Sequence, residues 1–148
     1  NIEYIYTIVG EGADYERIAY AILDLKLTNS VKLVGKKTKE ELIQIYKKSD
    51  IYIQYSISEG FCNSVLEAQA MGLLCIVSNA EGLPENIENN KTGWLVNSLE
   101  APKLASKILE VTNLTEQEKE LMCSNARQRV LNYFSLEKQK EAFKNFYS

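Results

Sequence analysis

The chain alternates short runs of β-branched and aromatic residues with longer stretches in which apolar residues recur every three to four positions. This alternation predicts an α/β fold, because parallel strands must be joined by crossovers that are usually helices. The expected strands are residues 2–9, 31–34, 51–55, 74–78 and 93–96. Residues 74–78 are almost continuously apolar, as in a strand covered by helices on both faces of its sheet.

Two capping boxes, Thr38 with Glu41 and Thr115 with Glu118, indicate where two of the helices begin. The expected helices cover residues 14–25, residues from Thr38, about 61–71, a short helix whose first residue is Pro84, then 101–111, about 115–133 and 135–147. We therefore predict a Rossmann-like, doubly wound parallel sheet with a helical C-terminal third. A length of 148 residues suits one domain, residues 1–148.

Composition excludes several classes of function. The chain has no histidine, so it offers no Ser-His-Asp triad, histidine base or His-ligated zinc. A net charge of −3 gives no electrostatic footprint for nucleic acid. Three widely spaced cysteines favour free thiols in a reducing cytoplasm. No apolar run approaches the roughly 20 residues that span a bilayer.

Two glutamates, Glu59 and Glu67, carry the clearest chemical signal in the chain. Glu59 is expected in the loop after the strand 51–55, and Glu67 in the helix that this loop opens into. The free amides and the dipole of that helix favour a diphosphate. Gly60 lets the backbone approach a ligand closely. Glu67 suits two neighbouring hydroxyls such as those of a ribose, and Glu59 would lie nearer the transferred group. For either glutamate alone, a solvated surface position is the simpler interpretation.

The loops that follow three of the strands are expected at one edge of the sheet. Ligands of doubly wound sheets bind outside the carboxyl ends of the strands. We therefore expect the turn at residues 10–12, the Glu59 loop and the loop at residues 79–82 to converge on one cleft. The turn Gly10-Glu11-Gly12 lacks the third glycine of a dinucleotide fingerprint, because Tyr15 occupies that position, so an NAD enzyme is not expected.

The segment 56–72 resembles the signature of glycosyltransferase family 4, the group 1 enzymes, which reads Ser-x-x-Glu-Gly-Phe-x-x-x-x-x-Glu-Ala-x-Ala-x-Gly. The similarity continues through residues 76–78, 81–85 and 92–96, and it reaches back to 9–12 and 31–35. The resemblance implies the C-terminal, donor-binding domain of a GT-B enzyme. Such enzymes transfer a sugar with retention of configuration and without a metal.

The resemblance also implies roles for individual residues. Glu59, as the catalytic candidate, would contact the donor sugar, and Glu67 would bind the ribose. Independently of the resemblance, the position of Asn63 near the start of the helix leaves two interpretations, contact with the donor or capping of the helix. Residues expected near the ligand are Gly60 and Phe61 beside the sugar and phosphates, Gly35 and Lys36 beside the base, and Gly10 and Gly12. No cofactor is expected beyond a UDP-, GDP- or ADP-sugar donor.

The chain departs from the family pattern at several points. Tyr55 and the pair Leu74-Cys75 replace proline-containing positions, which we interpret as packing substitutions. The first strand and helix of the family's domain, with an Arg and a Lys that clamp the diphosphate, are expected to lie outside the chain, as is the acceptor-binding N-terminal domain. Alone, the chain would bind a donor weakly and transfer nothing. Full-length, it would act on a saccharide or a lipid-linked acceptor, with possible peripheral membrane association. The alternatives are a non-catalytic interaction module and a nucleotide-sugar epimerase of the same fold.

Overall fold

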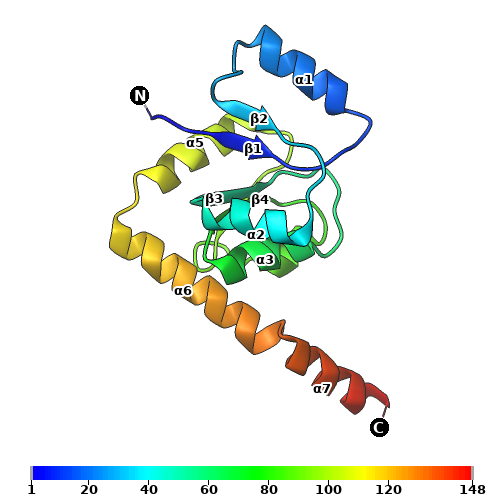
Figure 1. Cartoon of the computed structure of the whole chain (residues 1–148). Helices are drawn as coiled ribbons and strands as arrows, with labels where there is room; N and C mark the ends of the chain where they lie inside the picture. Colours follow the sequence, from blue (N-terminus) through cyan, green and yellow to red (C-terminus); the bar gives the residue numbers. More distant parts are fainter. Residues whose placement is uncertain (1, 148) are drawn as a thin grey trace. The chain divides into compact units, whose positions relative to one another are not determined.

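The computed structural model describes residues 2–147 (Figure 1). These residues form two compact units, which divide between Ile45 and Tyr46. In the first unit, β1 (Tyr6–Ile8) and β2 (Val31–Leu33) form a parallel pair, joined by α1 (Tyr15–Asp24). Residues 2–5 were predicted as strand, and this is wrong. Their partner β2 begins only at Val31, which lies opposite Tyr6. Leu25 of the predicted helical stripe lies just beyond α1, at its C-cap, and is 64% exposed.

Helix α2 (Lys39–Lys47) begins at the predicted capping box. The Thr38 backbone N–H donates to Glu41 Oε2 over 2.9 Å, and the Glu41 N–H donates to Thr38 Oγ1 over 3.3 Å. Both groups would otherwise be unpaired donors of the first turn. The second half of α2 supplies Tyr46, which is buried in the second unit.

The second unit is built on a parallel sheet of three strands in the order β3-β4-β5. Strands β3 (Ile51–Gln54) and β5 (Trp94–Val96) flank β4 (Leu74–Ser78), and Ile51 lies opposite Leu74 while Ile76 lies opposite Trp94. Every residue of β4 is buried, as its nearly continuous apolar run predicted. The parallel α/β class is thus confirmed, with the five strands distributed over a two-stranded and a three-stranded sheet.

Five helices complete the second unit: α3 (Asn63–Met71), α4 (Leu83–Asn86), α5 (Ala101–Thr112), α6 (Glu116–Tyr133) and α7 (Leu136–Tyr147). Pro84 is the second residue of α4 and not the first, since the helix starts at Leu83 after Gly82. The predicted capping box of α6 is present, with Thr115 at the N-cap. The core cluster joins Leu74 and Ile76 of β4 to Trp94, Val96 and Val111.

Arg129 ties α6 to the end of α4. Its guanidinium donates to the backbone carbonyls of Glu85 and Asn86 over 2.7 and 3.0 Å and to Glu88 Oε1 over 3.2 Å. The carbonyls at a helix C-terminus lack partners within the helix and carry partial negative charge, so a cation is favoured there. In the described part of the chain, no helix combines the length and hydrophobicity needed to cross a membrane.

Candidate functional site

The loop between β3 and α3 carries Glu59, and α3 begins at Asn63, one or two residues later than the start predicted near Phe61 or Cys62. Cys62 occupies the N-cap position in an extended conformation, with no hydrogen bond from its side chain to the helix. Asn63 is the first helical residue and its side chain is exposed. The capping alternative for Asn63 is therefore wrong, and its contact with a donor stays a prediction.

The Glu59 carboxylate is held against the end of β3. Its Oε2 atom accepts a hydrogen bond from Gln54 Nε2 over 3.3 Å and one from Ser56 Oγ over 3.2 Å. Gln54 also donates to Ser56 Oγ over 2.9 Å. Glu59 is half-buried. Gln54 was not among the predicted site residues. The only signal for it in the sequence is that it is a polar residue in an otherwise apolar and aromatic strand.

Glu67 lies on α3 with an exposed side chain, next to Tyr46 of α2. Burial, followed by the negative charge of Glu67, raises the pKa of Tyr46 to about 12. The Tyr46 ring meets that of Tyr52 edge-on, with 6.1 Å between centroids. Glu67 thus has a neutral hydroxyl beside it and solvent around it, which leaves its carboxylate able to accept hydrogen bonds from a ligand.

Asn86 forms hydrogen bonds with the backbone at the start of α3. It is a fully buried residue that sequence reasoning missed. The Asn86 side chain accepts from the Cys62 N–H and donates to the Cys62 carbonyl, both over 3.1 Å. The Val65 N–H donates to the same carbonyl over 3.2 Å. Within residues 2–147, the N–H groups of Asn63 and Ser64 have no acceptor. Those two amides remain available to an anion.

The loop at residues 79–82 packs directly on the Glu59 loop through Gly82. A Cβ atom at Gly82 would lie 2.5 Å from the carbonyl carbon and oxygen of Gly60 and 2.8 Å from the Glu59 carbonyl oxygen. Gly82 has φ +88°, a conformation that favours glycine. Ser78 Oγ, at the end of β4, donates to the Ser56 carbonyl over 2.6 Å. Two of the three loops predicted to converge, the Glu59 loop and the loop at residues 79–82, are therefore in contact.

Phe61, predicted beside the sugar and phosphates, is 44% exposed and packs on Phe134, with 5.4 Å between ring centroids. Phe134 in turn lies under the guanidinium of Arg129, 4.8 Å from the ring centroid. Gly60 is exposed, and a Cβ placed on it would meet nothing within 4 Å. The Glu59 loop is thus anchored by Gly82 and by Phe134, while the Cα atom of Gly60 faces open space.

The remaining predicted residues belong to the first unit, where Gly10 and Gly35 come together. The Gly10 N–H donates to the Gly35 carbonyl over 3.0 Å, and both residues have positive φ, +135° and +68°. The Gly12 carbonyl accepts from the Tyr15 N–H over 3.1 Å at the start of α1. Lys36 is exposed. That these residues join Glu59 and Glu67 in one cleft stays a prediction.

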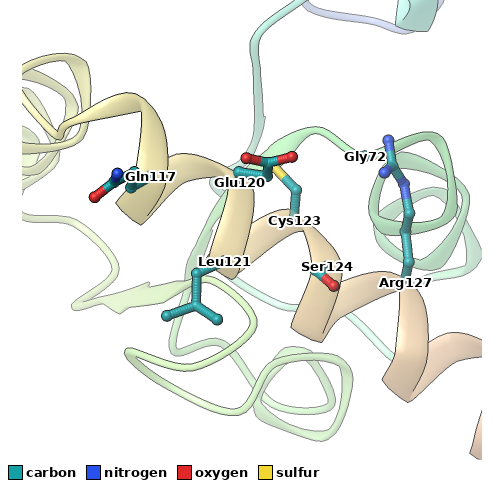
Figure 2. Close-up of a pocket in the computed structure, with 7 residues that line it drawn as sticks. All are labelled: Gly72, Gln117, Glu120, Leu121, Cys123, Ser124 and Arg127. Atoms are coloured by element: carbon teal, nitrogen blue, oxygen red, sulfur yellow. The ribbon is translucent and has the colours of Figure 1, made fainter.

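A separate hollow of about 630 Å³ lies at the opposite, C-terminal end of α3 (Figure 2). Its lining residues come from the C-cap of α3 and one side of α6: Gly72, Gln117, Glu120, Leu121, Cys123, Ser124 and Arg127. Arg127 donates to the Met71 carbonyl over 3.4 Å, and its guanidinium occupies the space that a Cβ of Gly72 would need. None of the predicted site residues lines this hollow.

Comparison with known proteins agrees with the signature. The model of the family described as Glycosyl transferases group 1 matches residues 1–129. The chain therefore belongs to the group 1 glycosyltransferases. This assignment argues against the epimerase alternative.

Among curated relatives, the amylovoran biosynthesis glycosyltransferase AmsK of Erwinia amylovora is 36% identical over 113 residues, which cover 72% of this chain and 28% of AmsK. The UDP-Gal:alpha-D-GlcNAc-diphosphoundecaprenol alpha-1,3-galactosyltransferase of Escherichia coli is 28% identical over 144 residues, 97% of this chain and 36% of that protein. The chain thus spans about a third of the length of these relatives.

Among solved structures, a glycosyltransferase from Rickettsia africae matches with a TM-score of 0.90 and 32% identity. The match covers 97% of this chain and 39% of that one. The GT-B resemblance inferred from the signature is thus supported at the level of the fold as well as the sequence.

Proposed function

We propose that this chain is the donor-binding domain of a retaining, metal-independent glycosyltransferase that takes a hexose from a nucleotide diphosphate sugar. The observation that carries the proposal is the arrangement at the start of α3. There, the Glu59 carboxylate, the unobstructed Cα of Gly60 and the unpaired amides of Asn63 and Ser64 occupy one short segment. A diphosphate would accept from the two amides, and the sugar would meet the Glu59 carboxylate.

Glu67 is proposed to bind the ribose. Its exposed carboxylate stands in the second turn of the same helix and keeps acceptor capacity beyond its contact with Tyr46. A carboxylate accepts hydrogen bonds from two adjacent hydroxyls with good geometry. Gly35 and Lys36 in the first unit are proposed to border the base, and Gly10 and Gly12 to lie near the ligand.

The acceptor is proposed to be a saccharide or a lipid-linked saccharide, in the assembly of a surface polysaccharide or glycolipid. The support is the E. coli relative, whose name specifies a UDP-galactose donor and a diphosphoundecaprenol-linked acceptor. We propose that the reaction takes place in the cytoplasm and that it needs no further cofactor.

Kinetics of the intact enzyme with UDP-galactose, GDP-mannose and ADP-glucose test this proposal. Glu67→Ala should lower kcat/KM for the preferred donor at least about tenfold, because each lost hydrogen bond to a charged group contributes about 1.5–3 kcal/mol. The matched control is Glu110→Ala, whose exposed carboxylate pairs with Lys107 on α5. Unchanged kcat/KM in Glu67→Ala would remove Glu67 from the donor site. Failure of the intact wild-type protein to transfer from any of the three donors would favour the non-catalytic alternative.

A further inference from the structure

A continuous chain of hydrogen-bonded side chains leads from the start of α3, along β3, to Glu59. We call it the β3 hydrogen-bond chain, and its members in order are Cys62, Ser64, Tyr52, Gln54, Ser56 and Glu59. Cys62 Sγ lies 3.1 Å from Ser64 Oγ, and Ser64 Oγ lies 3.0 Å from the Tyr52 hydroxyl. The Tyr52 hydroxyl lies 2.7 Å from Gln54 Oε1. Gln54 and Ser56 then reach Glu59 Oε2.

The direction of every hydrogen bond in this chain follows from the charge on Glu59. A carboxylate only accepts, so the Gln54 amide must present its N–H groups to Glu59 and its oxygen to Tyr52. The single Tyr52 proton is then donated to Gln54, and Ser64 must donate to Tyr52. Cys62 is left to donate its S–H proton to Ser64. Burial raises the pKa of Tyr52, in keeping with a hydroxyl that retains its proton.

We propose that Gln54 and Ser56 are positioning residues that hold Glu59 Oε2, with Tyr52 and Ser64 fixing the orientation of the Gln54 amide, so that Oε1 is presented to the donor sugar. This inference rests on the proposed function for the identity of the ligand. The geometry supports it because both hydrogen bonds converge on the same oxygen. Glu59 Oε1 receives no hydrogen bond from residues 2–147. A carboxylate held by one oxygen has lost most of its rotational freedom, which lowers the entropic cost of binding through the other.

The chain of contacts also links the sugar end of the site to the phosphate end. Cys62 is the N-cap of α3, and Ser64 contributes one of the two amides available to an anion. The Ser64 backbone N–H is therefore available to the diphosphate, while the Ser64 side chain belongs to the β3 hydrogen-bond chain that orients Glu59. Residues that contact a ligand discriminate by geometry only when neighbouring side chains hold them in place in this way.

The test compares two variants with a matched control. Gln54→Leu removes one of the two donors to Glu59 Oε2 and leaves Ser56, and Tyr52→Phe removes only the hydroxyl that fixes the Gln54 amide. Tyr55→Phe is the control, since it also deletes one phenolic hydroxyl, but that hydroxyl contacts Asn97 and Glu100. Affinities for UDP and UDP-galactose are measured separately by calorimetry on the intact protein. A positioning role predicts about tenfold weaker UDP-galactose binding in Gln54→Leu, a smaller loss in Tyr52→Phe, and UDP affinity within about twofold of wild type.

Equal losses for both ligands would show a merely structural role and would overturn the inference, as would unchanged UDP-galactose binding in Gln54→Leu. If the wild-type protein binds none of UDP-galactose, GDP-mannose and ADP-glucose, the proposed function fails, and a measurement without ligand then decides on the β3 hydrogen-bond chain. The side-chain amide signals of Gln54 in ¹H–¹⁵N spectra should move in Glu59→Ala and in Tyr52→Phe but not in Tyr55→Phe. Gln54 signals that stay in place in all three variants would refute the β3 hydrogen-bond chain.

Discussion

Replacing Gly82 with alanine tests the close packing of the two loops that form the candidate site. The added Cβ would overlap the Gly60 carbonyl group, at 2.5 Å from its carbon and oxygen, and the neighbouring atom is backbone that cannot rotate away. The φ of +88° adds a second penalty, because L-residues rarely adopt it. The backbone conformation should cost about 1–3 kcal/mol. The steric overlap should add about 1–3 kcal/mol.

The free energy of unfolding of Gly82→Ala should therefore fall by about 2–6 kcal/mol, a large part of the 5–15 kcal/mol that is typical of a domain. Urea unfolding followed by tryptophan fluorescence measures it, because Trp94 is the single tryptophan and is 4% exposed in the core of the second unit. Gly60→Ala is the control, since its Cβ would meet nothing within 4 Å. If Gly82→Ala were as stable as Gly60→Ala, the account of how the two loops pack would be wrong.

Three further predictions concern the donor site, a helix cap and alkaline pH. Gly60→Ala should have the same free energy of unfolding as wild type but should weaken UDP-galactose binding to the intact protein, because a methyl group would stand where the ligand approaches. Unaltered binding would place the donor elsewhere. Thr115→Ala should lower the free energy of unfolding by about 1 kcal/mol, through loss of the cap on the Glu118 N–H; Thr112→Ala, whose hydroxyl donates to the Leu109 carbonyl, is the comparison. The pKa of Tyr46 is raised from 10.0 to about 12 in the folded chain, so the unfolded chain loses the Tyr46 proton at lower pH than the folded chain does. The contribution of Tyr46 to the free energy of unfolding is therefore complete below pH 10 and declines between pH 10 and 12. Urea unfolding across that range should show a smaller decline in Tyr46→Phe, and an equal decline would exclude Tyr46 as a source.

Local sequence signals predicted most of the elements. The capping boxes at Thr38 and Thr115 need only residues three positions apart, so they are readable without tertiary information. The buried strand β4 was predicted by its nearly continuous apolar run. Residues 2–5 were assigned wrongly because a strand also needs a partner, and the length of β2 is not apparent from the residues of β1.

The contacts around Glu59 and α3 depend on residues far apart in the sequence, which is why the prediction of the site was incomplete. Asn86 pairs with Cys62 across 24 positions, and nothing near Asn86 in the sequence indicates this. Tyr55 was interpreted as a packing substitution, and it does contact the core cluster. Its hydroxyl also donates to the Asn97 carbonyl over 2.6 Å and accepts from the Glu100 N–H over 2.8 Å. The proline found in the family at this position has no side-chain hydroxyl to make either hydrogen bond.

Titration of UDP-galactose into the ¹⁵N-labelled chain, followed by backbone amide shifts, tests the central claim most directly. The account predicts that the largest shifts at millimolar ligand fall on Gly60, Asn63 and Ser64, with Glu67 next, and that Glu67→Ala diminishes all of them. Shifts confined to Gly72, Ser124 and Arg127, which line the hollow at the other end of α3, would contradict it.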